Sequence, residues 1–222
     1  CRIFSSTAPL LISEVLFFMN LLSSSVSVTR YLVDGSLEAP VLETIRKGLI
    51  KDTFKDIDVD HSENVTGWTS FENPFLPGFE DSSFVIGSYL IFSLRLDKKS
   101  IPPKVIKKHI AIEIVRQLEN KPRPFLTRDE KQSIKDHVIH TLVQRIPAIP
   151  SIYDLIWNLE ESRLWFFSNL KAANEALETL FIKSFNLSLI HLFPYTTAEL
   201  GSGLSSAERD LLLKLSPTKF AE

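Results

Sequence analysis

The sequence predicts an α+β fold, in which helices cover one face of a mainly antiparallel sheet and a basic two-helix hairpin projects from it. Two patterns support this class. Short runs of alternating or β-branched residues predict strands, and apolar residues at three- and four-residue spacing predict helices. Along the 222 residues these patterns follow the order βα, ββ, αα, ββ, α, β, which is typical of α+β proteins. The apolar fraction of 44% is that of a globular protein with a substantial core.

The first part of the chain predicts strands around one helix. Residues 25–33 alternate and are β-branched, as in a strand. Residues 37–54 have helical spacing, and Pro40 is tolerated there because it falls in the first turn. Residues 64–79 predict a short strand followed by an ordered loop rich in glycine and proline. Residues 82–97 predict one long strand.

The middle of the chain predicts two helices joined by a short loop. Two prolines open the first helix, which ends near Asn120. A capping box formed by Thr127 and Glu130 starts the second, which runs to about Arg145, where "IPAIP" stops it. Such a pair is an αα hairpin. The apolar stripe of the first helix is Val105, Ile106, Ile110, Ile114 and Leu118.

The last part predicts two strands, a helix, a strand and a short helix. Residues 152–169 form two strands around a turn at "EESR", and residues 170–185 form an amphipathic helix. The segment "LSLIHLFP" adds a strand. A Gly/Ser linker then leads to a helix capped at Ser205 or Ser206.

These elements give a predicted domain organisation. The chain begins with Cys and its only methionine is Met19, so residues 1–18 are expected to be upstream or non-native sequence. Residues 19–98 and 148–200 form the central α+β domain, 99–147 the hairpin, and 201–222 the linker and C-terminal helix. The apolar run at residues 9–22 is interrupted by Glu14 and too short for a membrane span. A single cysteine excludes an internal disulfide and favours a reducing cytoplasm.

Catalytic motifs are absent from the sequence. It contains no GxSxG, phosphate-binding GxxxxGK[ST], GxGxxG or CxxC pattern, so we expect no enzyme and no cofactor. His137 and His140 are three residues apart, and His109 precedes Glu113 by four, so each pair could face one metal ion. Because neither pair has a third ligand, we expect no metal site, and a metal-dependent enzyme using His137 and His140 is the alternative.

The same patterns predict the surroundings of His140 and of the three tryptophans. His140 falls beside the apolar stripe of its helix and is expected at the boundary of the core. Trp157 and Trp165 lie in apolar strand patterns and are expected in the core. Trp68 lies in a Gly/Pro-rich segment and is the tryptophan expected to be available for stacking.

Positive charge is concentrated in the hairpin. Residues 95–145 contain thirteen Lys or Arg against six Asp or Glu, a net charge of +7, in a chain whose net charge is −2. Phosphate backbones favour such a surface through counterion release, although the same field could attract an acidic protein. The predicted DNA contacts are Lys104, Lys107, Lys108, Arg116, Lys121, Arg123, Arg128, Lys131, Lys135 and Arg145.

The same region resembles a known family. "PPKVIKKHI" followed by "RDEKQSIKDHVIHTLVQR" resembles the RdgC family of bacterial, recombination-associated DNA-binding proteins. "TGWTS" resembles the family's G-W-V-P loop, and "SLEAPVLETIRKGL" its first helix. The resemblance runs from about Leu21 to Leu200. The matching hairpin positions are Pro102, Val105, Ile106, Lys107, Glu130, Lys131, Ile134, Lys135, Asp136, Val138, His140, Leu142 and Arg145.

The resemblance implies a cytoplasmic, nucleoid-associated protein that binds DNA, most simply duplex DNA, without sequence preference. Family members form a ring-shaped homodimer around DNA and restrain the recombinase on single strands, and their hairpin is a finger that meets the partner's finger. They usually continue beyond the length of this chain. At the finger contact they carry an aromatic residue, where this sequence has Ile146 and Pro147. We therefore expect a shortened or diverged member that acts as a dimer and clamps or encircles DNA. The alternative is a protein-interaction module whose hairpin mediates dimerisation or binds an acidic partner.

Overall fold

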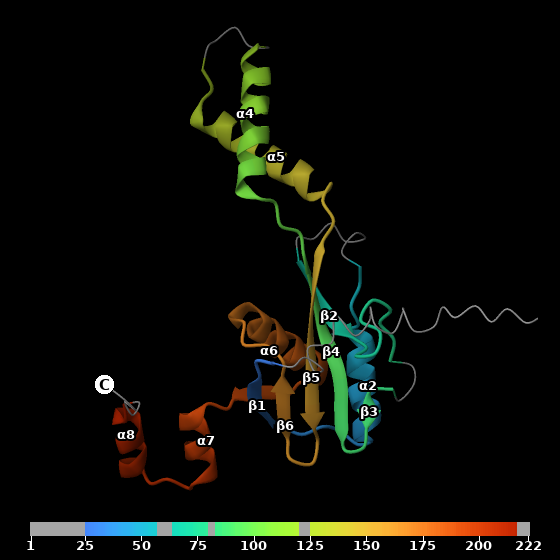
Figure 1. Cartoon of the computed structure of the whole chain (residues 1–222), viewed down its shortest axis with the longest axis vertical. Coiled ribbons are helices and arrows are strands. Elements are labelled where there is room, and N and C mark those ends of the chain that lie inside the picture. Colours follow the sequence, from blue (N-terminus) through green and yellow to red (C-terminus); the bar gives the residue numbers. More distant parts are fainter. Residues whose placement is uncertain (1–24, 57–63, 80–82, 120–124, 217–222) are drawn as a thin grey trace, which may run out of the picture. The chain divides into compact units, whose positions relative to one another are not determined.

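A computed structural model describes residues 25–56, 64–79, 83–119 and 125–216 (Figure 1). The predicted α+β class is confirmed, because helices accompany a seven-stranded antiparallel sheet. The expectation for residues 1–18 falls outside the described ranges. The elements are β1 (Thr29–Asp34), α2 (Val41–Lys51), β2 (Asn64–Thr69), β3 (Val85–Ile86), β4 (Tyr89–Lys98), α4 (Pro103–Glu119), α5 (Arg128–Val143), β5 (Ile149–Asn158), β6 (Arg163–Phe166), α6 (Lys171–Phe185), β7 (Ser188–His191), α7 (Pro194–Gly201) and α8 (Ser206–Lys214).

The chain divides into two compact units. The first comprises residues 1–53, 68–94 and 153–222, and the second comprises residues 54–67 and 95–152. The strands follow the order β2-β4-β5-β6-β1-β7, and β3 pairs with β4. Within the first unit, β1 pairs antiparallel with both β6 and β7, and β5 pairs antiparallel with β6.

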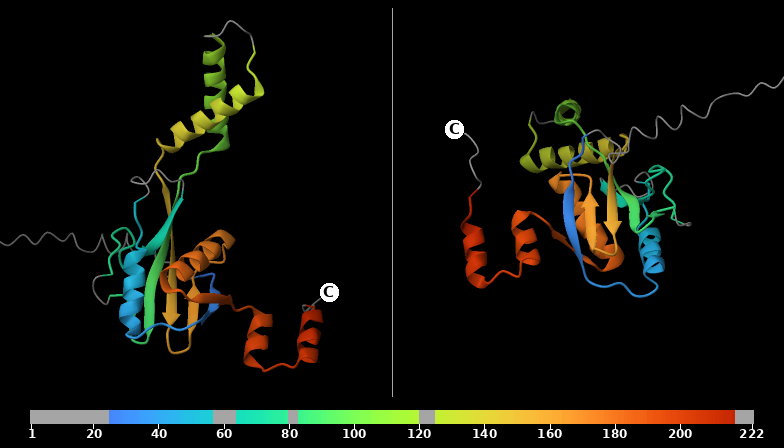
Figure 2. Two further views of the ribbon diagram at one scale, coloured as in Figure 1. Left: turned by 180° about the vertical axis from the view of Figure 1, so that it is seen from behind. Right: turned by 60° about the horizontal axis from the view of Figure 1, so that its bottom comes forward.

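Both long helices of the first unit pack on the same core. Side chains at alternate strand positions enter this core, among them Tyr31 and Val33 on β1. Helix α2 adds Ile45 and Leu49, and helix α6 adds a heptad-spaced apolar stripe, so the two helices cover one face of the strands (Figure 2). The α6 stripe is Ala173, Leu177, Leu180, Phe181 and Phe185.

Several predicted element boundaries differ from the structure. The predicted strand 82–97 is a hairpin, because Gly87 takes a left-handed φ of 64° and turns the chain, so that Ile86 faces Tyr89. The first strand begins at Thr29, four residues later than predicted. Pro40 precedes helix α2 instead of lying within it.

Helix α7 was not predicted. Sequence reasoning extended the preceding strand through Pro194, but β7 ends at His191 and Pro194 opens the helix. Proline suits this position because the first helical residues have no intrahelical partner for their N–H groups. The final helix α8 begins after Ser205, and the predicted cap is confirmed by a 3.4 Å hydrogen bond from the Glu208 amide to the Ser205 hydroxyl.

Trp68 lies in the core, and its predicted availability for stacking is wrong. Its side chain is 0% exposed and meets the Phe92 ring edge-on at a centroid distance of 5.2 Å. The indole Nε1 donates a 2.8 Å hydrogen bond to the Ser184 hydroxyl on α6. Trp157 is 2% exposed, as predicted. Trp165 is partly exposed, because it alternates with the core residues of β6 and so lies on the opposite face of the sheet, against the prediction.

The Ser184 hydroxyl continues this hydrogen-bond chain to Asp52. It donates to the Asp52 carboxylate at 3.0 Å, and the Lys183 ammonium lies 2.6 Å from the other carboxylate oxygen. Burial raises the pKa of a carboxyl, but the hydrogen bonds from Lys183 and Ser184 outweigh this and hold the pKa of Asp52 below its ordinary value. Asp52 is therefore an ionised, paired carboxylate at the end of α2.

The second unit contains the predicted helical hairpin. Helices α4 and α5 meet along an aliphatic seam, in which Ile134, Val138 and Leu142 are buried. The predicted capping box is confirmed: the Thr127 amide donates to Glu130 at 2.9 Å, and the Glu130 amide donates to the Thr127 hydroxyl at 3.4 Å. The α4 side of the seam is Ile106, Ile110, Ile114 and Leu118. Val105, predicted to belong to it, is exposed.

No helix in the described ranges has both the length and the apolar composition needed to cross a bilayer.

Gly67 on β2 allows close contact with Phe54, and we predict that Gly67→Ala destabilises the protein. A Cβ atom at residue 67 would lie 2.4 Å from the Cα of Phe54, which is backbone and cannot turn aside. Overpacking of this kind costs about 2 to 3 kcal/mol, or roughly 5 to 10 °C in the thermal midpoint of a chain this long. Gly78→Ala is the matched control, because a Cβ there meets no atom within 4 Å. Equal midpoints for the two variants would contradict the packing described here.

Candidate nucleic-acid interface

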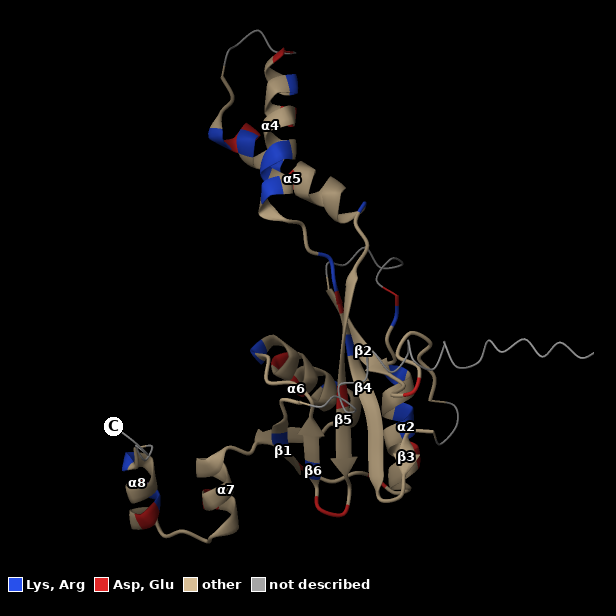
Figure 3. Ribbon diagram, viewed as in Figure 1, with Lys and Arg blue, Asp and Glu red and all other residues tan. Residues whose placement is uncertain are grey.

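The predicted DNA-contacting side chains lie on the surface of the hairpin. Lys121 and Arg123 fall outside the described residues. The other eight are all exposed, and Lys and Arg positions occur along both helices (Figure 3). On α4 these are Lys104, Lys107, Lys108 and Arg116; on α5 and just after it they are Arg128, Lys131, Lys135 and Arg145.

Seven of these eight cations form no ion pair with a carboxylate of the described residues. In the first unit, five basic side chains form ion pairs of 2.6 to 3.9 Å, namely Arg46, Arg163, Lys171, Lys183 and Arg209. On the hairpin, Arg116 lies 3.8 Å from Glu113. Throughout the described residues, the following form no ion pair: Lys104, Lys107, Lys108, Arg128, Lys131, Lys135 and Arg145.

Three of the five carboxylates described on the hairpin are engaged by nearby residues. Glu130 accepts hydrogen bonds in the capping box. Asp136 accepts from the Gln132 amide at 2.9 Å, and Glu113 accepts from the Gln117 amide at 3.3 Å. These short-range contacts stabilise the two helices and leave the lysines solvated.

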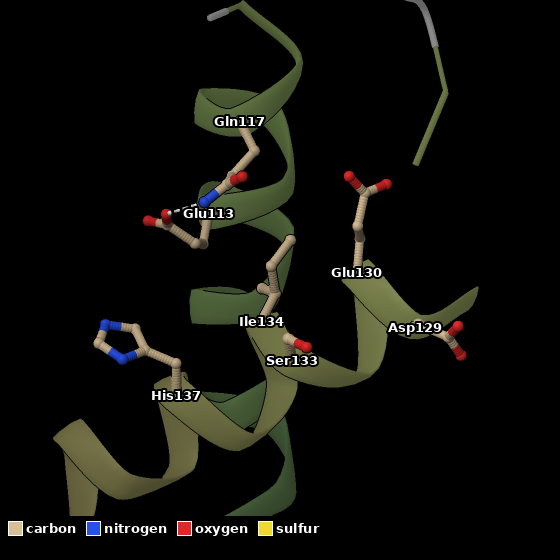
Figure 4. A pocket seen from close by; sticks show the side chains of 7 residues that line it. All are labelled: Glu113, Gln117, Asp129, Glu130, Ser133, Ile134 and His137. Atoms are coloured by element: carbon tan, nitrogen blue, oxygen red, sulfur yellow. Dashed lines mark hydrogen bonds between the residues drawn. The ribbon is translucent and has the colours of Figure 1, made fainter. Parts of the chain in front are cut away.

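A groove between α4 and α5 contains two adjoining cavities. One, of about 300 Å³, is lined by Gln117, Asp129, Glu130, Ser133 and Ile134 together with Glu113 and His137. In Figure 4, Glu113 and His137 lie on one side of it, and Asp129 and Glu130 on the other. The second cavity, of about 320 Å³, shares Glu113 and His137 and adds His109, Ile112, Arg116, Val138, Thr141, Leu142 and Arg145.

The histidines are arranged differently from the sequence hypothesis. His137 lines the groove beside Glu113 and His109 from α4. His140 lies outside it and is exposed, against the prediction of a boundary position, with its Nε2 3.5 Å from the Gln144 amide nitrogen. In the part of the chain that the structure describes, no group of three or more His, Cys, Asp or Glu residues is placed to hold a metal ion.

The outer side of α4 is apolar, which sequence reasoning missed. Val105, Ile112 and Val115 point away from the seam, and Ile112 and Val115 are 53% and 56% exposed. Phe125, just before α5, is 63% exposed. Their spacing of seven and three residues was a detectable signal, because it defines a second stripe opposite the first on the same helix. At the predicted dimer contact, Ile146 is half-buried and Pro147 is exposed.

Arg95 in the second unit differs from the exposed hairpin cations because it is held by a carboxylate. It donates two hydrogen bonds to the Asp97 carboxylate, at 2.7 and 2.8 Å, and its guanidinium lies 4.0 Å from the centroid of the Phe54 ring. A bidentate pair with a buried carboxylate fixes the side chain in place. Arg95 therefore has a structural role.

A cavity of about 650 Å³ in the first unit is lined by groups that bond to one another. The Tyr31 hydroxyl lies 2.7 Å from Asn174 Oδ1 and 2.9 Å from Glu178 Oε1, and burial and the hydrogen bond to Glu178 raise the pKa of Tyr31. Lys171 lies 3.6 Å from Glu175 across the same rim. These contacts connect β1 to α6 and are structural.

Comparison with known proteins identifies a family for most of the chain. The family model described as "Putative exonuclease, RdgC" matches residues 27–200, which include the hairpin and every described strand. No curated protein matches the chain significantly. Because the family model covers more than half of the chain, this protein belongs to the RdgC family.

Proposed function

We propose that this RdgC-family protein binds DNA without sequence preference and thereby modulates homologous recombination. The observation that carries the proposal is the set of seven exposed hairpin cations that have no carboxylate partner among the residues the structure describes. A lysine or arginine side chain without a carboxylate partner can contact a phosphate and release a counterion from the DNA. An ion-paired side chain must first leave its partner. Sequence-specific binding requires side chains that contact base edges in a groove of the duplex. Phosphate contacts carry no sequence information, so binding through them is nonspecific.

In this proposal the protein acts as a dimer that clamps or encircles duplex DNA. Its association with the nucleoid follows from this binding. It acts without catalysis, although the matched family model carries the description of an exonuclease. Incubation of end-labelled duplex with the protein and Mg²⁺ tests this point. We expect full-length strands after prolonged incubation, and shortening that increases with protein concentration would assign a nuclease instead.

We predict a steep dependence of DNA affinity on salt. If about six hairpin cations contact phosphates, log affinity falls against log salt with a slope of about −5, and Lys131→Gln with Lys135→Gln brings the slope to about −4. At 0.1 M salt each lost contact costs roughly eightfold in affinity. Fluorescence anisotropy with two duplexes of equal length and unrelated sequence measures both quantities, and we expect equal affinities for the two duplexes.

The matched control removes the same charge from another part of the chain. Lys47 and Lys51 are exposed on α2 in the first unit, so Lys47→Gln with Lys51→Gln changes the net charge equally. We expect this pair to leave the slope near that of the wild type. A flat salt dependence, or equal losses in the two double variants, would refute binding through the hairpin.

A second candidate function is self-association through the hairpin, because α4 carries exposed apolar side chains opposite its packed seam. We predict that Val105→Asp with Val115→Asp, which line neither cavity of the hairpin, shifts a dimer to monomer at micromolar concentration. The fold is expected to persist, since both side chains are exposed. Sedimentation velocity measures the shift. Leu211→Asp with Leu213→Asp on α8, at 63% and 65% exposure, is the control.

DNA binding and self-association are distinguished by measuring DNA affinity and dimerisation separately. Loss of the dimer with unchanged affinity per DNA site assigns the apolar side of α4 to self-association and the basic side chains to DNA. An unchanged sedimentation coefficient in the α4 variant would exclude the apolar side of α4 as the dimer contact.

A further inference from the structure

We infer that the cavity bounded by Arg116 and Arg145, between α4 and α5, is a seat for one phosphodiester group of bound DNA. This inference rests on the DNA binding proposed above and specifies where one backbone phosphate is held. It adds His109, His137 and Thr141 to the site, none of which was assigned a role in DNA binding from the sequence.

The two helices present matching rows of side chains to this cavity. Helix α4 contributes His109, Glu113 and Arg116, and α5 with its C-terminal turn contributes His137, Thr141 and Arg145. Spacing of three and four residues keeps each row on one side of its helix. Val138 and Leu142 form the floor and are buried in the hairpin seam. The seam therefore fixes the distance between the two rows.

Four polar side chains of this cavity have no partner among the described residues. The Thr141 hydroxyl is half-buried, yet it makes no side-chain hydrogen bond within the described residues. The same holds, over those residues, for the imidazoles of His109 and His137 and for the guanidinium of Arg145. A helical threonine commonly satisfies its hydroxyl on the carbonyl four residues earlier, as Thr179 does at 2.8 Å on α6. The free Thr141 hydroxyl thus points to an external partner.

The chemistry of these groups suits a phosphodiester. Arginine offers a planar fork of N–H donors that matches phosphate oxygens, and hydroxyl and imidazole groups supply further donors. The volume of about 320 Å³ is roughly ten times the ~30 Å³ occupied by one water in the liquid, which leaves room for a phosphate and bridging waters. The cavity's single carboxylate, Glu113, is already held by Gln117 and lies 3.8 Å from Arg116.

The neighbouring cavity shows why an anion is held only at the arginine end. Both cavities share Glu113 and His137, but the neighbour continues to Asp129 and Glu130, which repel phosphate (Figure 4). The unpaired lysines on both helices extend the positive field around the arginine end, as a continuous phosphate backbone requires. This distribution favours DNA over an isolated carboxylate of an acidic protein.

The decisive test uses a variant that removes no charge. Thr141→Val in the full chain deletes the hydroxyl and keeps the shape, so we expect affinity for plain duplex to fall about tenfold with the salt slope unchanged, since hydrogen bonds to charged groups are strong. Thr179→Val, exposed on α6, is the matched control and should bind like the wild type. Anisotropy titrations at several salt concentrations give affinity and slope together.

A double-mutant cycle tests whether the two arginines share a phosphate. If they do, the combined Arg116→Ala and Arg145→Ala variant loses less affinity than the product of the single losses. Arg145→Ala combined with Arg128→Ala, which lies outside the cavity, should lose the full product. Thermal midpoints confirm that each variant is folded.

The outcomes distinguish the seat from DNA binding in general. If the wild-type chain binds no DNA, the proposed function itself fails. If it binds with a steep salt slope while Thr141→Val equals the wild type, or while the Arg116 and Arg145 losses multiply, the seat is refuted and DNA binding stands. If Thr141→Val instead weakens binding of an oligoglutamate and leaves DNA affinity unchanged, the cavity takes a carboxylate, and the phosphodiester assignment is refuted.

Discussion

The hydrogen-bond chain from the Trp68 indole through Ser184 to Asp52 is the interaction on which the first unit depends. It joins β2, α6 and the end of α2, and each member is the hydrogen-bond partner of the next. An unpaired indole N–H in this core would cost about 1 to 3 kcal/mol, and an unpaired buried carboxylate more. The Trp68 backbone amide adds a 3.0 Å hydrogen bond to the Asp52 carbonyl, which fixes the end of α2 beside the strand.

The hairpin is held by different forces, which explains its surface. The seam between α4 and α5 is aliphatic, and only one side of each helix packs in it. The remaining sides carry either solvated cations or, on the outer side of α4, exposed Ile112 and Val115. One small scaffold can therefore present a basic surface to DNA and an apolar surface to a second chain. Ile112 also lines the cavity that contains Arg116 and Arg145, so the apolar surface of α4 adjoins the proposed phosphate seat.

Ion pairing differs between the first unit and the hairpin. Five of the nine basic side chains described in the first unit have a carboxylate partner, and one of the eight predicted DNA contacts described on the hairpin has one. In the first unit, side chains such as Lys183 and Arg46 are held by carboxylates and contribute to local structure. On the hairpin, Glu113, Glu130 and Asp136 serve helix caps and neighbouring amides instead. Three potential partners of the cations there are thus engaged with the backbone and with neighbouring side chains. This arrangement is what a phosphate-binding surface needs, and a net charge alone does not reveal it.

The sequence by itself determined the α+β class, the hairpin with its Thr127–Glu130 cap, and the positions of the exposed cations, because helical periodicity and capping are local properties. Tertiary structure decided the rest. Trp68 looked like a loop residue, yet pairing of β2 placed it in the core, and a left-handed Gly87 divided a segment that periodicity read as one strand. Likewise, His137 was paired with His140 by spacing, whereas the crossing of α4 and α5 placed it beside His109, Arg116 and Arg145. Contacts between residues distant in sequence depend on how faces pack against each other, and single-chain patterns do not encode that directly.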